Sequence, residues 1–112
     1  PPRPDPPSDR YVAELARSGC APLKAPQDLA RYLEDAGEIV RLGDGFVIGA
    51  GGYAVAKDLL VSECQAHGEI TPARFRDLLG AGRRDAQLLL ERFDSDGLTV
   101  RRGDVRTLRR KP

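Results

Sequence analysis

The 112-residue chain has no Trp and no Met, and only three Tyr and three Phe. Its hydrophobic core must therefore be built mainly from Leu, Val, Ile and Ala. No apolar run approaches the ~20 residues of a membrane-spanning helix, and no signal-peptide pattern stands at the start. We therefore expect a cytoplasmic protein that has no membrane partner.

Residues for metal, redox or catalytic chemistry are equally scarce. Cys20 and Cys64 are far apart and form no CxxC motif, and His67 is the single histidine. A structural zinc site or a disulfide framework is therefore not expected. The sequence has no GxxxxGK[ST] loop and no GxSxG motif, so it predicts neither a P-loop nor a serine nucleophile. We expect no enzyme, no metal and no cofactor in this chain.

The most informative stretch of the chain is residues 69–108. Thr71 is a good helix N-cap, and Pro72 suits the first position of that helix. A Gly-Ala-Gly turn at 80–82 is followed by a second helix, and then by short strands at 98–101 and 105–108. This order of helix, turn, helix and hairpin is typical of a winged helix-turn-helix.

An earlier segment repeats this pattern. Residues 27–36 are predicted to be a helix, and 39–42 and 46–48 are predicted strands around the turn at 43–45. The two segments match without gaps at an offset of 60 residues, which pairs Gln27 with Gln87. A repeat at a fixed interval indicates a duplicated unit. We therefore predict tandem winged helices, mostly α with small β wings, in the α+β class.

Three segments follow from this prediction. Residues 1–9 are a Pro-rich linker or boundary segment, 10–49 a partial first unit and 50–112 the second unit. The second unit should begin with a helix at 53–65, and the glycine-rich 49–52 should be a flexible joint.

The first unit lacks one helix of a complete winged helix. Either a helix at 10–17 is its first helix and the middle helix is missing, or the chain is cut inside the domain. Residues 18–26, which contain two prolines and a glycine, are expected to be largely irregular.

Basic residues are concentrated in the second part of the chain. Residues 69–112 contain 11 Lys/Arg and 7 Asp/Glu, a net charge of +4, whereas 1–68 contain 7 and 10, a net of −3. This asymmetry suggests a polyanionic partner, although an ordinary solvated surface is the alternative.

Arg83 and Arg84 are expected in the first turn of a helix, where free N–H groups favour phosphate. Alternation along the wing sends Arg101 and Arg102 to opposite faces, so at most one of them shares a surface with Arg83. Candidate nucleic-acid contacts are Gly82, Arg83, Arg84, Arg101, Arg102 and Arg106.

Several motifs occur in a combination that resembles one known family. They are EITPARFRDLLG at 69–80, RR at 83–84, LERFD at 90–94, GLT at 97–99 and RGDVR at 102–106. They resemble the last winged helix of bacterial selenocysteine-specific elongation factors, the SelB family. The resemblance implies a translation factor that carries selenocysteinyl-tRNA with GTP. Its C-terminal winged helices bind the mRNA hairpin, the SECIS, that marks a UGA codon for recoding.

Carried over to this chain, the resemblance matches Arg83 and Arg84 to an Arg-Lys pair that lies against the RNA. The chain departs from the family at Ala81 and Gly82, where hydroxyl residues are frequent, and at Asp85, where Tyr is frequent. These changes remove two hydroxyls and one aromatic ring that could contact RNA.

The resemblance implies a monomeric, RNA-binding C-terminal fragment that meets the ribosome indirectly, through the full-length factor. GTP and magnesium are expected only for the GTPase domain, which these residues do not include. Two alternatives remain open: a tandem winged-helix DNA-binding module of a transcription regulator, and a winged-helix protein–protein adaptor.

Overall fold

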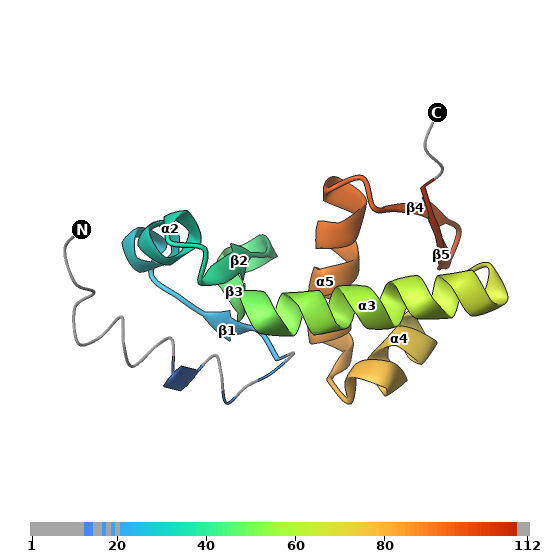
Figure 1. The fold of residues 1–112 in the computed structure, drawn as a ribbon, viewed down its shortest axis with the longest axis horizontal. Coiled ribbons are helices and arrows are strands. Elements are labelled where there is room, and N and C mark those ends of the chain that lie inside the picture. Colours follow the sequence, from blue (N-terminus) through green and yellow to red (C-terminus); the bar gives the residue numbers. More distant parts are fainter. Residues whose placement is uncertain (1–12, 15–16, 18, 20, 110–112) are drawn as a thin grey trace. The chain divides into compact units, whose positions relative to one another are not determined.

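The computed structural model describes residues 13, 14, 17, 19 and 21–109, and the structural statements below refer to these residues. They form two compact units, one up to Ala54 and one from Val55 onward. The elements, labelled in Figure 1, are β1 (Leu23–Lys24), α2 (Gln27–Asp35), β2 (Ile39–Arg41), a 3₁₀ turn (Gly43–Gly45), β3 (Phe46–Gly49), α3 (Ala50–His67), α4 (Pro72–Leu79), α5 (Arg83–Ser95), β4 (Thr99–Arg102) and β5 (Val105–Leu108).

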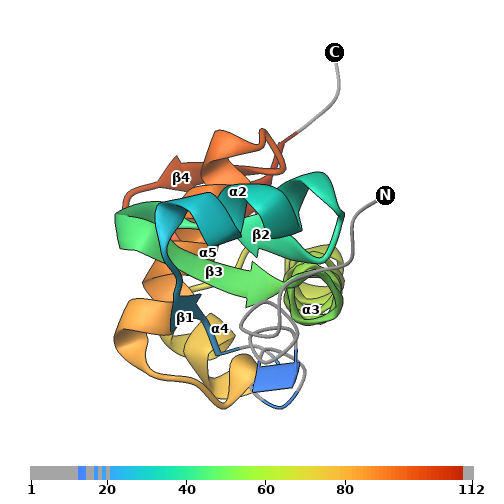
Figure 2. The ribbon, with the colours of Figure 1, turned by 90° about the vertical axis from the view of Figure 1, so that its left-hand side faces the viewer.

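The first unit is built from a helix and a three-stranded antiparallel sheet in the order β1-β3-β2. Figure 2 shows α2 beside these strands. The predicted helix and hairpin are confirmed to within a residue or two, and Asp44 in the turn has a φ of 59°. The core consists of Ala30, Leu33, Ile39 and Val47, with Leu23, Ala25 and Leu29 packed against it.

Where they are described, residues 18–26 are largely irregular as predicted, and the exception is the two-residue strand β1. Leu23 pairs with Val47, and Lys24 pairs with Phe46. A two-residue strand has no sequence periodicity, and only the neighbouring β3 defines it. Ala25 and Pro26 alone separate β1 from α2, so no helix lies between them.

The remaining N-terminal predictions fall mostly on residues that the structure does not describe. Of the predicted helix at 10–17, only Ala13, Glu14 and Arg17 are described, and all three are helical. The linker predicted at 1–9 lies outside the described residues.

The flexible glycine joint predicted at 49–52 is wrong as local structure. Gly49 ends β3, and Gly51 and Gly52 lie in the first turn of α3. A Cβ at Gly52 would lie 2.0 Å from the carbonyl oxygen of Gly19. Glycine is therefore required at position 52 by the close approach of the backbone.

In the second unit, local signals fix the ends of α4 as predicted. The Thr71 hydroxyl accepts a 3.0 Å hydrogen bond from the Arg74 N–H, and Pro72 occupies the first turn. Gly80 ends the helix at a φ of 66°, a conformation that favours glycine.

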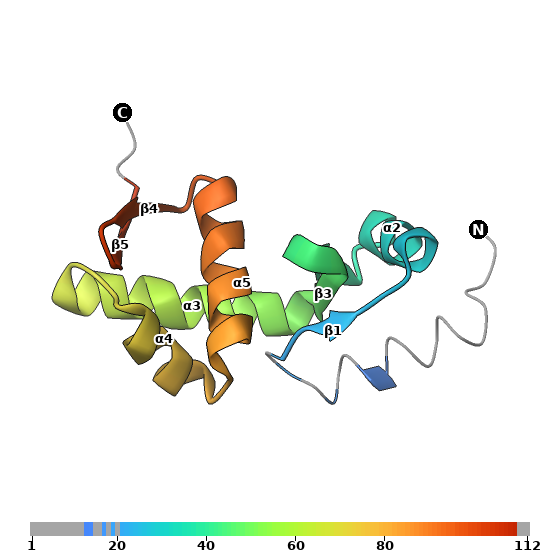
Figure 3. The same cartoon turned by 180° about the vertical axis from the view of Figure 1, so that it is seen from behind.

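The remaining elements complete a winged helix, and Figure 3 shows α4, α5 and the hairpin from behind. Leu98, Val100 and Leu108 are half-buried and lie at the margin of the core. Ile70 forms an isolated bridge to Arg106 and so adds a third, single-residue strand to the wing. The buried apolar residues of this unit are Ala56, Leu60, Cys64, Ile70, Phe75, Ala86, Leu88, Leu89, Leu90 and Phe93.

The internal repeat is confirmed in backbone hydrogen bonds at the helix ends. Glu38 N–H donates to Leu33 O at 2.9 Å, and Leu98 N–H donates to Phe93 O at 3.0 Å. Beyond the turns the gapless offset of 60 is wrong, because Arg41 faces Val47 whereas Arg101 faces Arg106. The second strands are therefore equivalent at an offset of 59.

Candidate nucleic-acid interface

The start of α5 presents backbone donors and two exposed arginines. Gly82 occupies the N-cap position, and no side chain caps the helix. Arg83 and Arg84 follow in the first turn, and both are exposed. Arg83 has no polar partner among the described residues. The uncapped N–H groups and the helix dipole make this end attractive to an anion.

Asp85 modifies this positive surface. Its carboxylate lies 3.6 Å from Arg84, which is too long for a hydrogen bond. The Oδ1 atom of Asp85 is buried and accepts no hydrogen bond. Arg84 is thus partly compensated, which leaves Arg83 as the stronger anion contact.

Gly82 contributes space rather than an obligatory conformation. Its φ is −79°, and a Cβ built there would meet no atom within 4 Å. The predicted role of Gly82 therefore depends on leaving the N–H groups of α5 accessible.

A groove of about 380 Å³ runs beside this helix start. One wall comes from the N-terminal half of α4 and the other from α5. The cationic lining residues are Arg83 and Arg76, and the Arg76 side chain has no polar partner among the described residues. The complete lining is Thr71, Pro72, Ala73, Arg76, Arg83, Ala86 and Gln87.

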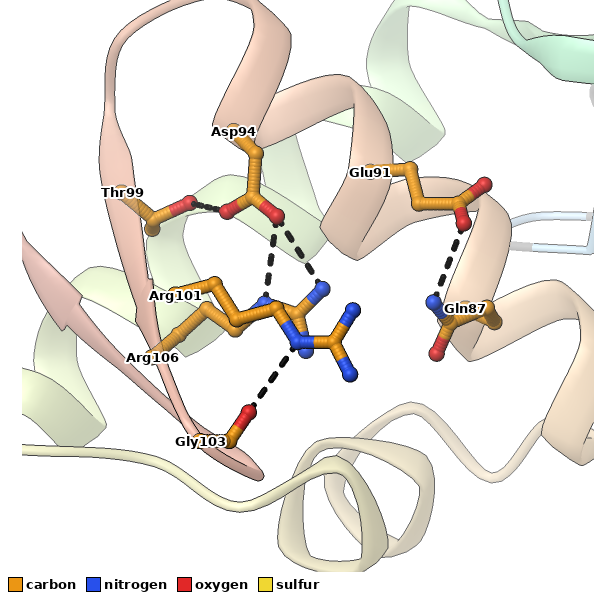
Figure 4. Close-up of polar contacts among 7 residues, drawn as sticks. All are labelled: Gln87, Glu91, Asp94, Thr99, Arg101, Gly103 and Arg106. Atoms are coloured by element: carbon orange, nitrogen blue, oxygen red, sulfur yellow. Dashed lines mark hydrogen bonds and ion pairs between the residues drawn. The ribbon is translucent and has the colours of Figure 1, made fainter.

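Arg76 and Gln87 are candidate contacts that sequence analysis missed. Arg76 lies in α4 on a face that only the packing against α5 defines. The Gln87 side chain donates a 3.1 Å hydrogen bond to Glu91, which holds its amide on the surface of α5 (Figure 4). The available signal was the spacing of Arg83 and Gln87, which places them one turn apart on α5.

The two wing arginines lie on opposite faces of the hairpin, as predicted. Arg101 is directly opposite Arg106 and shares its face, which is turned toward α5 (Figure 4). Its Nε donates a 3.0 Å hydrogen bond to the Gly103 carbonyl. Arg102 points to the other face, so only Arg101 extends the surface of α5.

The prediction that Arg106 contacts RNA is wrong. Its side chain is 2% exposed, and Nε and Nη2 both donate to Asp94 Oδ2, at 3.2 and 3.0 Å. The Thr99 hydroxyl donates to the other oxygen of the same carboxylate. The alternating pattern of the strand placed Arg106 on a face that is buried against α5 (Figure 4).

The opposite face of the wing borders a second hollow, of about 580 Å³. Its cationic lining residues are Arg102 and Arg109, and Cys64 lies at its base. Burial, together with the carboxylates of Glu63 and Glu69, raises the pKa of the Cys64 thiol. This cysteine is therefore a protonated core residue rather than a reactive thiolate.

Two kinds of site are missing from the described part of the chain. Residues 21–109 and the four described residues before them contain no cluster of His, Cys, Asp or Glu suited to a metal ion. Within the same residues, no helix is both long and apolar enough to cross a bilayer.

The family comparison concerns the second unit. Residues 62–108 match the family model described as the winged helix of elongation factor SelB. A comparison with curated proteins found no match.

Two solved structures resemble the chain over 95% of its length. The mRNA-binding domain of elongation factor SelB from E. coli, solved in complex with SECIS RNA, has a TM-score of 0.71 and 25% identity, and all of that domain is covered. A bacterial selenocysteine-specific elongation factor, EF-Sec, has a TM-score of 0.76 and 18% identity, which shows the fold alone. The chain covers 19% of EF-Sec. Residues 62–108 thus match the winged helix of elongation factor SelB, and over 95% of its length the chain is similar to the mRNA-binding domain of the E. coli SelB factor.

Proposed function

We propose that this chain binds an mRNA hairpin of the SECIS type through its second unit. The observation that carries the proposal is the uncapped start of α5, where Arg83 lies unpartnered beside a groove. The E. coli domain that aligns with the chain was solved in complex with SECIS RNA. RNA recognition of this kind requires both phosphate contacts and a place for unstacked bases.

The phosphate contacts come from α5 and the wing. Arg83 and the free N–H groups of α5 are suited to binding one phosphate. A guanidinium group can donate two hydrogen bonds to two oxygens of the same phosphate. Arg84 adds charge, although Asp85 compensates it in part. Arg101 extends the same surface along the wing, on the face turned toward α5.

The groove is suited to an unstacked base. Pro72 and Ala73 line it with small apolar side chains, Ala86 is almost fully buried in its wall, and Gln87 carries an amide for hydrogen bonding. Arg76 supplies a guanidinium plane on which a base can stack. A duplex without unpaired bases lacks this second kind of contact.

The proposed role in translation is that of the RNA-binding part of a longer factor. The chain covers 19% of EF-Sec, so most of such a factor lies in parts that this chain does not match. We propose that these parts bind GTP with magnesium. We propose also that they deliver selenocysteinyl-tRNA to the ribosome that translates the mRNA carrying the hairpin. The chain itself would act as a cytoplasmic monomer that needs no cofactor.

The direct test is the change Arg83→Ala. Binding to the hairpin should weaken by about 1–3 kcal/mol, as for the loss of a close specific contact. Arg109→Ala, on the other side of the wing, should cost less and affect hairpin and scrambled RNA alike. The dissociation constants need to be measured at two salt concentrations, because phosphate contacts make the logarithm of the affinity fall linearly with the logarithm of the salt concentration.

Two results would contradict the proposal. Equal losses for Arg83→Ala and Arg109→Ala on both RNAs would reduce the site to a diffuse basic surface. Tighter binding to duplex DNA of equal charge would favour a transcription regulator, and failure to bind either nucleic acid would favour a protein–protein adaptor.

A further inference from the structure

The ion pair Arg106–Asp94 involves the strand residue directly opposite Arg101 on the wing. Asp94 has one oxygen bonded to both Nε and Nη2 of Arg106, and its other oxygen accepts from Thr99. Both oxygens of the carboxylate therefore accept hydrogen bonds from within the unit. The carboxylate is three-quarters buried, with 27% of its side chain exposed.

Arg101 lies on the wing beside Arg106 and has no hydrogen bond or ion pair with the Asp94 carboxylate. It is the register partner of Arg106 and lies on the same face of the hairpin. Figure 4 shows the two arginine side chains beside each other, both running toward α5. The only hydrogen bond recorded among the described residues for the Arg101 side chain goes to the Gly103 carbonyl, at 3.0 Å. Its charged group thus remains on the surface.

The first unit shows what happens without a buried arginine. Glu34 and Arg41 occupy the positions that match Asp94 and Arg101 at the offset of 60, and they form an ion pair at 3.6 Å. The strand residue opposite Arg41 is Val47, which is apolar and buried. In that unit the helix carboxylate takes the wing arginine as its partner.

We infer that Arg106 is a positioning residue for RNA binding: by occupying Asp94, it keeps Arg101 available to the RNA. This inference rests on the proposed function. Removal of Arg106 alone leaves Asp94 an unpaired, partly buried carboxylate, and Arg101 is the nearest guanidinium on the same hairpin face. Asp94 then captures Arg101, as Glu34 pairs with Arg41.

The test compares four variants for hairpin binding: Arg101→Ala, Arg106→Val, Asp94→Asn and the double variant Asp94→Asn with Arg106→Val. Valine is the residue that the first unit has at the matching position. We expect Arg101→Ala and Arg106→Val each to weaken binding about tenfold. Asp94→Asn and the double variant should stay within about twofold of the unchanged chain, because neither contains a carboxylate that can capture Arg101.

Arg102→Ala is the matched control, because it removes the neighbouring arginine from the opposite face of the wing. It should produce a small loss that is equal for hairpin and scrambled RNA. A purely structural role for the pair predicts a different pattern, in which Asp94→Asn and Arg106→Val lose affinity equally and the double variant is not rescued. That pattern would overturn the inference.

A second measurement does not depend on RNA. In Arg106→Val, the side-chain Nε–H signal of Arg101 in ¹⁵N NMR should shift and become protected from solvent exchange. In the double variant, its chemical shift and its exchange rate should return to the values of the unchanged chain. An unchanged signal in a folded Arg106→Val chain would also overturn the inference. If Arg106→Val does not fold, Asp94→Asn still decides, since a tenfold loss there contradicts capture. Failure of the unchanged chain to prefer the hairpin would instead refute the proposed function.

Discussion

The two units share a backbone pattern but fill the inner face of the hairpin in opposite ways. In both, the helix ends at a left-handed glycine, Gly37 or Gly97, and the chain then enters the first strand. The first unit turns Ile39 and Val47 into an apolar core. The second unit has Thr99 and Arg106 at the matching positions, and both are bonded to Asp94.

This difference separates two ways of holding a wing. Apolar packing is non-directional and tolerates small shifts of the strand. A forked guanidinium–carboxylate pair fixes both distance and angle, and any misfit leaves a charge without a partner. The ionic wing therefore gains a defined placement of its outer residues, including Arg101, and becomes sensitive to the loss of a single side chain.

The largest effect that distinguishes the two wings should follow from Asp94→Ala. This change leaves Arg106 buried without its carboxylate, and we expect the second unit to lose about 3 kcal/mol of unfolding free energy. We choose the lower end of the range for buried pairs because Asp94 is partly exposed. Glu34→Ala breaks an exposed pair in the first unit and should cost less than about 1 kcal/mol.

Amide hydrogen exchange can measure both units in one sample. The matched reporters are the N–H groups of Glu38 and Leu98, which close equivalent helix ends. Asp96→Ala is the control inside the second unit, because its pair with Arg92 at 3.0 Å is exposed. Equal losses of unfolding free energy for Asp94→Ala and Asp96→Ala would show that burial of the ion pair adds nothing to the stability of the second unit.

Sequence analysis predicted the elements that local chemistry specifies. Thr71, Pro72 and Gly80 define α4 through capping and backbone preference, and glycine with aspartate at each turn defines the hairpins. Strand β1 was missed because Leu23 and Lys24 are extended only through pairing with β3. The start of α3 was missed because consecutive glycines in the first turn of a helix have the same sequence pattern as a flexible linker.

The candidate site was likewise predictable only where local sequence specifies the position of a residue. Arg83 could be placed because a helix N-terminus is visible in sequence. Burial of Arg106 could not, since it depends on Asp94 lying twelve residues earlier on a packed helix. Arg76 joins the site only through the packing of α4 on α5.

A smaller effect should come from α4, which lies between the Ile70 bridge and α5 in the second unit, whereas α2 follows β1 directly in the described part of the first unit. Thr71 caps α4 through its hydroxyl, whereas Pro26 before α2 offers no side-chain cap. Thr71→Ala should therefore lower the unfolding free energy of the second unit by about 1 kcal/mol. The measurement is urea denaturation together with exchange of the Arg74 and Phe75 amides.

Thr71→Ser is the matched control, because it keeps the hydroxyl acceptor and should restore most of the loss. The Glu38 amide in the first unit should be unaffected. A loss of similar size in Thr71→Ser would assign the effect to packing of the methyl group instead of the cap.

The smallest difference concerns pH and depends on Cys64. Its pKa is raised in the folded unit by burial and by nearby carboxylates, so the folded chain holds the thiol proton more tightly than the unfolded chain does. The resulting stability is complete below the pKa of an unfolded thiol, ~8.5, and is lost as pH rises from there through the folded pKa.

Exchange of the Leu98 amide should therefore accelerate above this pH more than intrinsic exchange chemistry explains. Cys64→Ala should remove that excess, whereas Cys20→Ala, at a position outside the described residues, should leave it unchanged. An excess that persists in Cys64→Ala would assign the alkaline loss to another group.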